Sequence, residues 1–377
     1  MTPTRAAAVP IATDPRPVVR VADLNVKVRA GGEWTHLVRD VSYTVDPGDC
    51  LAIVGESGAG KSITIRAVLG LLDPHKFQVT GKVWLGGTEL GALRPAARRA
   101  HVTRHASLVF QDPARSLNPI MRVGPQIAET LLKGSGRQER LTRAQARERS
   151  VDLMRAVGIG APEERYHAYP HELSGGMKQR IVIAIALACG SQVMFCDEPT
   201  SALDVTTQAQ IMDLLDDLRA KRGITTVVIT HDLALAASRA ERVIVMYAGQ
   251  VVEALPAARL AASARMPYTE ALIYAAPDPD GIAPPMAKTA IVSGAQSPPL
   301  PGGRPPVPPV VGLPRPIEGR PPDPRFPLPG CSFQPRCGRA EADCATQAPA
   351  LTVVAANHSL RCWHPLAAGS VLEAAHS

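Results

Sequence analysis

A glycine-rich segment at residues 55–62 constrains this 377-residue chain more than any other part of its sequence. The segment reads GESGAGKS and fits the pattern G-x-x-x-x-G-K-[ST]. An apolar run at 51–54, typical of a strand buried on both faces, precedes it, and an apolar helical stretch at 63–72 follows it. In such a strand–loop–helix unit the backbone N–H groups and the positive end of the helix dipole surround phosphate oxygens. The context therefore favours a phosphate site over a chance glycine-rich turn.

The residue types in this loop predict separate roles. The glycines allow the backbone to curl around the phosphates, Lys61 would neutralise the β- and γ-phosphates, and Ser62 would ligate Mg²⁺. The residues predicted to contact a nucleotide are Gly55, Ser57, Gly58, Gly60, Lys61, Ser62 and Ile63.

Two adjacent carboxylates follow a second apolar run at 193–196. A strand there would hold Asp197 close to the Mg²⁺, and Glu198, one residue further, could polarise an attacking water. Paired acids after an apolar strand are common, so this motif gains its meaning from the phosphate loop. Cys196 lies inside the run and is expected to be a small buried hydrophobe.

The order of apolar patterns predicts an α/β fold. Strand patterns occur at 18–21, 24–28, 37–45, 51–54, 193–196, 225–230 and 242–247, and helical stretches separate the later ones. Between residues 113 and 172 the strand patterns stop, and helices are predicted at 124–132 and 142–157. This predicts a helical subdomain, at about 113–175, inserted into the α/β core.

Composition limits the remaining choices. The formal net charge of +7 is compatible with a membrane surface or nucleic acid and proves neither. The longest apolar run, at 181–190, is shorter than the roughly 20 residues that a membrane span needs. Seven unevenly placed cysteines do not resemble a secreted disulfide scaffold. We expect a cytosolic chain that other subunits dock to a membrane.

The octapeptide LSGGMKQR at 173–180 resembles the signature sequence of ABC-superfamily ATPases. It provides a serine hydroxyl, two glycines and a helix start, which together favour an anion. In that family, the signature of one subunit covers the ATP held by the phosphate loop of another. The resemblance therefore implies a head-to-tail ATPase dimer with nucleotide contacts from Ser174, Gly175, Gly176 and Gln179.

More of the ABC pattern follows in the family's order, over residues 18–275. Gln111 matches the Q-loop glutamine, residues 201–204 match the D-loop, and His231 matches the switch histidine. The resemblance implies a P-loop ABC ATPase core with a β-subdomain and the inserted helical subdomain, ATP and Mg²⁺ as cofactors, and ATP hydrolysis. It assigns catalysis to Glu198, His231 and Gln111, Mg²⁺ to Ser62, Gln111 and Asp197, and nucleotide contacts to Asp204 and Trp34. Trp34 would stack on adenine, and Tyr43 is a weaker option.

Three features narrow the subfamily. They are QDP with SLNP at 111–119, MPYTEAL at 266–272, and the spacing Cys331-x5-Cys337-x6-Cys344-x17-Cys362. Together they resemble the ATPases of oligopeptide and dipeptide importers, a branch that includes nickel importers. The resemblance implies an ATPase at the cytoplasmic face of the cell membrane, peripheral to it, that energises peptide import.

The same resemblance names the partners. They are a second ABC ATPase, usually a different chain, two transmembrane permease subunits and an extracytoplasmic peptide-binding protein. Nickel or another small solute stays open as cargo, since this subunit does not touch it. A soluble ABC ATPase acting on DNA or ribosomes is disfavoured, because the chain has one cassette and no interleaved basic–aromatic patch. No nucleic-acid partner is expected.

The chain divides by composition. Residues 1–17 are expected to be a disordered tail and 18–276 the ABC ATP-binding domain. Residues 277–329 hold 18 of the 36 prolines and predict an extended linker. Residues 330–366 form a four-cysteine region, and 367–377 a terminal tail.

The four cysteines of the C-terminal region, Cys331, Cys337, Cys344 and Cys362, could ligate Zn²⁺ or an iron–sulfur cluster. Their spacing matches neither the CxxC pairs of common zinc sites nor the ferredoxin pattern. The family resemblance implies a [4Fe–4S] cluster, while zinc and no metal stay open. His358 and His364 are nearby and expected at the surface. Because the region is far from the phosphate motifs in sequence, we expect a structural or regulatory role.

Overall fold

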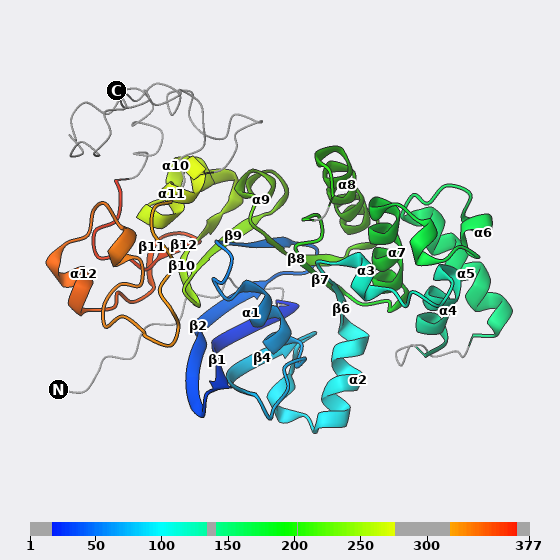
Figure 1. Cartoon of the computed structure of the whole chain (residues 1–377), viewed down its shortest axis with the longest axis horizontal. Coiled ribbons are helices and arrows are strands. Elements are labelled where there is room, and N and C mark those ends of the chain that lie inside the picture. Colours follow the sequence, from blue (N-terminus) through cyan, green and yellow to red (C-terminus); the bar gives the residue numbers. More distant parts are fainter. Residues whose placement is uncertain (1–16, 134–140, 202, 276–316, 368–377) are drawn as a thin grey trace, which may run out of the picture.

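The computed structural model describes residues 17–133, 141–201, 203–275 and 317–367. The expected terminal tails and most of the proline-rich linker fall outside these ranges. The described chain contains two β-sheets with helices packed around them (Figure 1).

The smaller sheet has four strands in the order β2-β1-β4-β5. Its strands are β1 (Val19–Ala30), β2 (Glu33–Val45), β4 (Phe77–Leu85) and β5 (Thr88–Glu89), and all pairings are antiparallel. The two strands predicted at 18–21 and 24–28 are one strand, β1. Its pairing register shifts after Val21, where Asp23 adopts the left-handed conformation (φ 50°).

The larger sheet has eight strands in the order β11-β12-β10-β9-β3-β8-β7-β6. Its strands are β3 (Cys50–Val54), β6 (Ala106–Val109), β7 (Val193–Asp197), β8 (Thr225–Thr230), β9 (Arg242–Tyr247), β10 (Gln250–Pro256), β11 (Thr352–Ala355) and β12 (His358–Leu360). The five strands from β9 to β6 pair in parallel. Three of these, β3, β7 and β8, are buried along their whole length, which explains their continuous apolar sequences.

Helix α1 (Lys61–Val68) follows β3 and is shorter than the stretch predicted at 63–72. Gly70 ends it in the left-handed conformation (φ 67°), and the N–H groups of Gly70 and Leu71 bond to the carbonyls of Ala67 and Arg66. This is the usual way in which a glycine terminates a helix. The apolar pattern continued past the helix because Leu69 is buried outside it.

The helical subdomain comprises α3 (Pro113–Ser116), α4 (Val123–Lys133), α5 (Arg143–Ala156), α6 (Pro162–Arg165) and α7 (Gly175–Ala188). Its described part between residues 113 and 172 contains no strand, as predicted. Ile127, Met154 and Ile181 are fully buried in its core. In Figure 1 this green bundle lies to one side of the sheets.

The remaining helices cover the sheets and their ends. The α-helices are α2 (Pro95–His105), α8 (Val205–Arg222), α9 (Leu233–Arg239), α10 (Leu260–Ser263), α11 (Pro267–Ala275) and α12 (Ala342–Thr346). Short 3₁₀ turns are η1 (Leu90–Ala92), η2 (Pro170–Glu172), η3 (Ala257–Arg259) and η5 (Gln334–Arg336).

The C-terminal cysteine region is part of the larger sheet. Strand β12 pairs antiparallel with β10, and β11 extends the sheet beyond it (Figure 1). The ring of Phe333 packs against Tyr247 of β9 and Tyr268 of α11, with centroid separations of 5.3 and 5.2 Å. The predicted separate region therefore shares a hydrophobic core with the ATP-binding domain. Ile317, in the segment predicted as linker, also packs against this core.

A buried charged residue joins the C-terminal region to the sheet. Glu253 of β10 is fully buried and accepts hydrogen bonds from His358 Nε2 (2.8 Å) and from the backbone N–H groups of Arg265 (2.8 Å) and Met266 (3.3 Å). The prediction that His358 lies at the surface is wrong, because this carboxylate holds the imidazole inside. Three donors satisfy the carboxylate, as a buried charge requires.

We predict that Glu253→Ala lowers the free energy of unfolding by about 3 kcal/mol, because three buried donors lose their acceptor. Urea denaturation followed by circular dichroism measures this. The matched control is Glu163→Ala, which removes an exposed ion pair with Arg155 (2.6 Å) and should cost no more than about 1 kcal/mol. Equal losses in the two variants would contradict the role of the buried carboxylate.

Candidate functional site

The phosphate loop at 55–62 joins the end of β3 to α1 and packs tightly on one side only. At Gly55 (φ 146°) a Cβ atom would lie 2.2 Å from the carbonyl oxygen of Met246, so a larger residue cannot occupy this position. Gly60 precedes α1 in the left-handed conformation (φ 97°). Ser57 and Gly58 are exposed, which leaves their backbone open to a ligand, and Ile63 is half-buried. The loop thus has one packed side and one accessible side.

Lys61 reaches back across its own loop. Its Nζ donates hydrogen bonds to the carbonyl oxygens of Gly55 (2.7 Å) and Glu56 (3.0 Å), and the residue is 5% exposed. Burial lowers the pKa of Lys61, against the opposing effect of the nearby carboxylates of Glu198, Asp197 and Glu56. The loop carbonyls thereby hold an ammonium group where phosphate oxygens would be received.

Ser62 and Asp197 meet at the ends of α1 and β7. Ser62 Oγ donates to Asp197 Oδ1 at 2.6 Å, and the carboxylate belongs to a residue that is 3% exposed. Arg66 Nη2 lies 3.8 Å from the other carboxylate oxygen. A hydroxyl and a carboxylate at this position are hard oxygen donors of the kind that Mg²⁺ prefers, so these residues fit the implied ion.

Glu198, Gln111 and His231 converge from three different strand ends. Gln111 Nε2 donates to Glu198 Oε2 at 3.0 Å, and His231 Nδ1 lies 3.7 Å from the same oxygen. Glu198 adopts the left-handed conformation (φ 48°), which is uncommon outside glycine and is often found at functional sites. The structure therefore unites the three residues predicted to be catalytic. It places Gln111 against Glu198 rather than against Ser62 and Asp197.

The signature segment begins α7. Ser174 is the N-cap residue, and its Oγ accepts a hydrogen bond from the N–H of Met177 (3.3 Å). A Cβ at Gly176 would lie 2.6 Å from Thr207 Cγ2, so this glycine is also needed for packing against α8. Gln179 is 1% exposed, so its side chain does not face solvent. Helices α7 and α1 are separated in Figure 1, so the signature does not cover the phosphate loop of its own chain.

Asp204 caps the N-terminus of α8. Its carboxylate accepts hydrogen bonds from the N–H (2.9 Å) and the hydroxyl (2.8 Å) of Thr207, and these bonds lower the pKa of Asp204. Within the predicted D-loop, Ala202 lies outside the described residues.

Trp34 and Tyr43 differ sharply in exposure, although both lie on β2. Trp34 is 48% exposed. It lies three residues before Leu37, where β2 comes close to the phosphate loop: a Cβ atom built at Gly60 would be 3.3 Å from the carbonyl oxygen of Leu37. At the usual rise of a strand, Trp34 is roughly 10 Å further along β2 from this contact. Tyr43 is buried, and burial raises the pKa of its phenol. Tyr43 is a packing residue, so the weaker adenine option is wrong.

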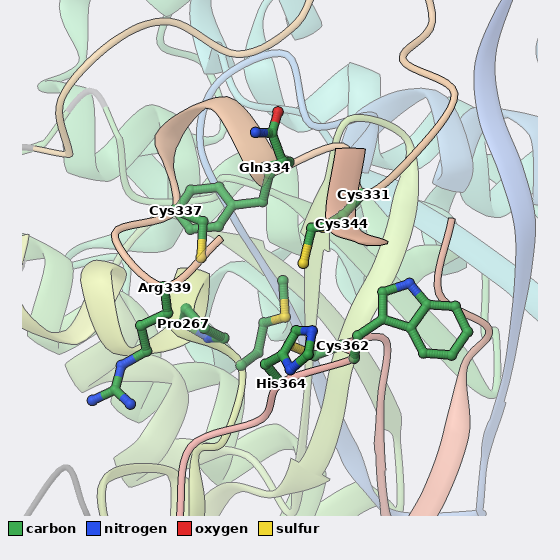
Figure 2. A pocket seen from close by; sticks show the side chains of 11 residues that line it. Pro267, Cys331, Gln334, Cys337, Arg339, Cys344, Cys362 and His364 are labelled. Carbon is green, nitrogen blue, oxygen red and sulfur yellow. The ribbon is translucent and has the colours of Figure 1, made fainter. Parts of the chain in front are cut away.

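Cys331, Cys337, Cys344 and Cys362 line one pocket (Figure 2). The N–H of Cys331 bonds to the carbonyl of Cys344 (2.8 Å), which brings the start and the middle of this region together. Burial raises the pKa of the Cys331 and Cys337 thiols, and that of Cys362 to about 11. A metal would therefore have to displace the protons of these thiols as it binds.

No three of the four cysteine sulfur atoms lie within 4.8 Å of one another. Four thiols are the ligand set both of zinc sites and of iron–sulfur clusters, so the residue types fit either group. Among the described residues, one set of three possible ligands is closer: Asp343, Cys344 and His364. His364 Nε2 contacts both carboxylate oxygens of Asp343 (2.8 and 3.0 Å).

The sequence analysis missed a contact between the cysteine region and the phosphate loop. Arg336 forms a bidentate ion pair with Glu56, at 2.6 and 2.9 Å. Tyr268 Oη accepts a hydrogen bond from the N–H of Glu56 (2.9 Å). No local pattern could have revealed this pair, since its members are 280 residues apart. The cysteine region is remote from the phosphate loop in sequence only.

Comparison with known families agrees with this geometry. Residues 38–201 match the family described as ABC transporter, and residues 252–296 and 307–344 match the family described as oligopeptide/dipeptide transporter, C-terminal region. Among solved structures, the dimeric post-hydrolysis ATP-binding cassette MJ0796, bound to ADP and Pi, superposes with a TM-score of 0.57 at 26% identity. The superposition covers 63% of this chain and 98% of that one. The fold and site thus define an ABC-type ATPase.

Curated relatives identify the branch. Dipeptide transport ATP-binding protein DppD of Bacillus subtilis is 37% identical over 347 residues, covering 92% of this chain and 94% of the relative. DppD of Escherichia coli is 39% identical over 326 residues, covering 86% and 90%. Oligopeptide transport ATP-binding protein OppD of Mycobacterium tuberculosis is 42% identical over 346 residues. The chain belongs to the family of oligopeptide and dipeptide transport ATP-binding proteins.

The relatives differ in how much of their own length this chain covers. The chain spans 52% of the mycobacterial OppD, about half its length, but nearly all of the two DppD proteins. Among its described residues, no helix is long and apolar enough to cross a membrane.

We predict that Lys61→Ala weakens Mg²⁺–ATP binding by about 10- to 100-fold, because it removes charge-assisted bonds to the phosphates. Isothermal titration calorimetry of the full chain measures the Kd. Lys221→Ala is the control, because Lys221 makes an exposed pair with Asp217 (2.7 Å) and should leave the Kd unchanged. An unaltered Kd in the Lys61 variant would refute the assignment of the phosphate site.

Proposed function

We propose that this chain binds and hydrolyses ATP to energise the import of oligopeptides or dipeptides across the cytoplasmic membrane. The observation that carries the hydrolytic part is the meeting of Gln111, Glu198 and His231 beside the Ser62–Asp197 pair. The transport part rests on membership of the oligopeptide and dipeptide family.

The phosphate loop and Lys61 hold the nucleotide in this proposal. The N–H groups at Ser57 and Gly58 face the phosphates, and Lys61 exchanges its loop carbonyls for the β- and γ-phosphate oxygens. Ser62, Asp197 and Gln111 would hold Mg²⁺, which would supply positive charge to the phosphates. Gln111 must first release Glu198. Trp34 stacks on the adenine.

Glu198 positions the water that attacks the γ-phosphate. In the structure, Glu198 Oε2 accepts a hydrogen bond from Gln111. In the reaction, the attacking water donates its hydrogen bond to this oxygen in place of Gln111. The new P–O bond forms on the water oxygen as the bond to ADP breaks, and the Glu198 carboxylate accepts the proton that the water loses. His231, 3.7 Å from the same oxygen, contacts the γ-phosphate side.

Two ATPase chains complete each site. Ser174, Gly175 and Gly176 of one chain cover the nucleotide on the other, and the separation of α7 from α1 within one chain supports this arrangement (Figure 1). Asp204 lies in the D-loop at the same interface, whereas Gln179, predicted as a nucleotide contact, is buried within α7 and not exposed to a nucleotide. We propose a heterodimer with a different ATPase chain, bound at the cytoplasmic face to two permease subunits that receive substrate from an extracytoplasmic binding protein.

The identity of the assembly has a direct test. The chain is purified from native membranes in mild detergent, and its companions are identified by mass spectrometry. Two integral membrane proteins, a second ATPase and a peptide-binding protein are expected. A binding protein specific for nickel would replace peptide as cargo, and ribosomal or DNA-bound companions would overturn the transport proposal.

We predict that Glu198→Gln lowers ATP turnover at least about 100-fold, because the amide cannot act as the base for the attacking water. The Kd for ATP stays close to that of the unaltered chain, so ATP is trapped. Phosphate release and equilibrium binding are measured together. Glu164→Gln, on exposed α6, is the control and keeps full turnover. Unchanged turnover in the Glu198 variant would eliminate its proposed role.

We propose that Cys331, Cys337, Cys344 and Cys362 hold a [4Fe–4S] cluster, supported by the pocket that the four side chains share (Figure 2). The cluster would cross-link the region. Anaerobically purified protein should contain iron and acid-labile sulfide in equal amounts and lose both in Cys337→Ser. Cys189→Ser, at the C-cap of α7 and outside the four-cysteine region, should retain them. Stoichiometric zinc without sulfide, or no metal, would reject the cluster.

A further inference from the structure

The C-terminal cysteine region contacts the phosphate loop through one buried arginine, Arg336. The side chain of Arg336 is 3% exposed, and its guanidinium pairs with both carboxylate oxygens of Glu56, at 2.6 and 2.9 Å. A bidentate pair of this kind fixes both the direction and the position of the carboxylate. Since Glu56 is the second residue of the phosphate loop, the contact reaches the nucleotide site itself.

The guanidinium of Arg336 makes further hydrogen bonds besides those to Glu56. It also donates to Glu318 O (2.8 Å), Ile317 O (3.1 Å) and Tyr247 Oη (3.2 Å). The charge lies 5.9 Å from the centroid of the Phe333 ring. Arg336 therefore has little freedom to follow Glu56 if the loop moves, and instead it constrains where Glu56 can be.

Glu56 in turn touches the residue that receives the phosphates. Its backbone carbonyl accepts a hydrogen bond from Lys61 Nζ (3.0 Å), and its N–H donates to Tyr268 Oη (2.9 Å). The side chain of Glu56 is thus held by Arg336, its N–H by Tyr268, and its carbonyl by Lys61. Any shift of Glu56 changes the position of the ammonium group.

A second contact joins the same two regions. Ser332 Oγ accepts a hydrogen bond from Arg39 Nη2 (3.2 Å), and the N–H of Arg39 donates to the carbonyl of Gly249 (2.8 Å). The N–H of Gly249 donates to the carbonyl of Ala59 in the phosphate loop (3.0 Å). Residues flanking both Cys331 and Cys337 therefore reach the loop by separate routes.

We propose that Arg336 and Tyr268 are positioning residues for ATP binding, and that the order of the cysteine region is transmitted to Lys61 through Glu56. This inference rests on the proposed binding of ATP. Arg336 lies next to Cys337, so a change that displaces the backbone at Cys337 also displaces Arg336 and alters its pair with Glu56. Nucleotide affinity and order of the cysteine region are then linked, each raising the other.

The test measures the Kd for Mg²⁺–ATP on the full chain by titration calorimetry. In Arg336→Met we expect the Kd to rise about ten-fold, because a charge-assisted pair that orients the loop is lost. Arg325→Met is the matched control: Arg325 is an exposed arginine in the segment just before this region, it pairs with the neighbouring Asp323, and the Kd of this variant stays unchanged. Failure of the unaltered chain to bind ATP would reject the proposed function, whereas normal binding by a folded Arg336→Met would reject this inference alone.

A second variant removes a smaller interaction, so that the proposal can still be tested if Arg336→Met does not fold. Tyr268→Phe removes only the hydroxyl that accepts from Glu56, and should raise the Kd about three-fold with an unchanged thermal unfolding profile. An unchanged Kd in this variant would remove Tyr268 from the proposal.

A double-mutant cycle tests the transmission. We expect Cys337→Ser to weaken ATP binding in the unaltered chain but to add no further loss in the Arg336→Met background, since both act through the same contact. Fully additive losses would show that the cysteine region does not act through Arg336, and would overturn the proposed route.

Discussion

Parallel hydrogen bonding between β3, β8, β7 and β6 aligns the carboxyl ends of four strands, and the phosphate loop, His231, the acidic pair and Gln111 each follow one of them. Val54 pairs with Thr230, and Asp197 pairs with Ile229, so the phosphate loop, the acidic pair and His231 begin at the same level of the sheet. Parallel α/β sheets place their ligands at this edge because all the loops that leave it point the same way. Ser62 can reach Asp197, and Gln111 can reach Glu198, only because this register holds.

The phosphate loop depends on a second constraint, its close packing against other backbone. Gly55 lies against the carbonyl of Met246, and Gly249 bonds to Ala59 while a Cβ on it would be 2.2 Å from the carbonyl of Leu37. The strands β9 and β2 therefore form the fixed side of the loop. Arg336 and Tyr268 hold it from the C-terminal region. The loop is accessible to a ligand on one side because it is anchored on the others.

Prediction from sequence succeeded where the interactions are local. Strands β8 and β9 were predicted with the bounds that the structure has, since continuous apolar runs mark strands buried on both faces. Helix α1 was predicted too long, because burial of Leu69 continued the pattern past the glycine that ends the helix. His358 was expected at the surface because its buried partner, Glu253, is 105 residues away.

The candidate site shows the same division. The sequence by itself determined the phosphate loop, the acidic pair, the signature and the four cysteines, because each is a short run or spacing whose residue types carry the chemistry. Only the tertiary structure decided that Gln111 contacts Glu198, that Gly176 must be small to admit Thr207, and that Arg336 holds Glu56. These contacts join residues that are distant along the chain, and their geometry depends on how whole elements pack. No local pattern of residues encodes such packing, so it emerges only when the fold brings them together.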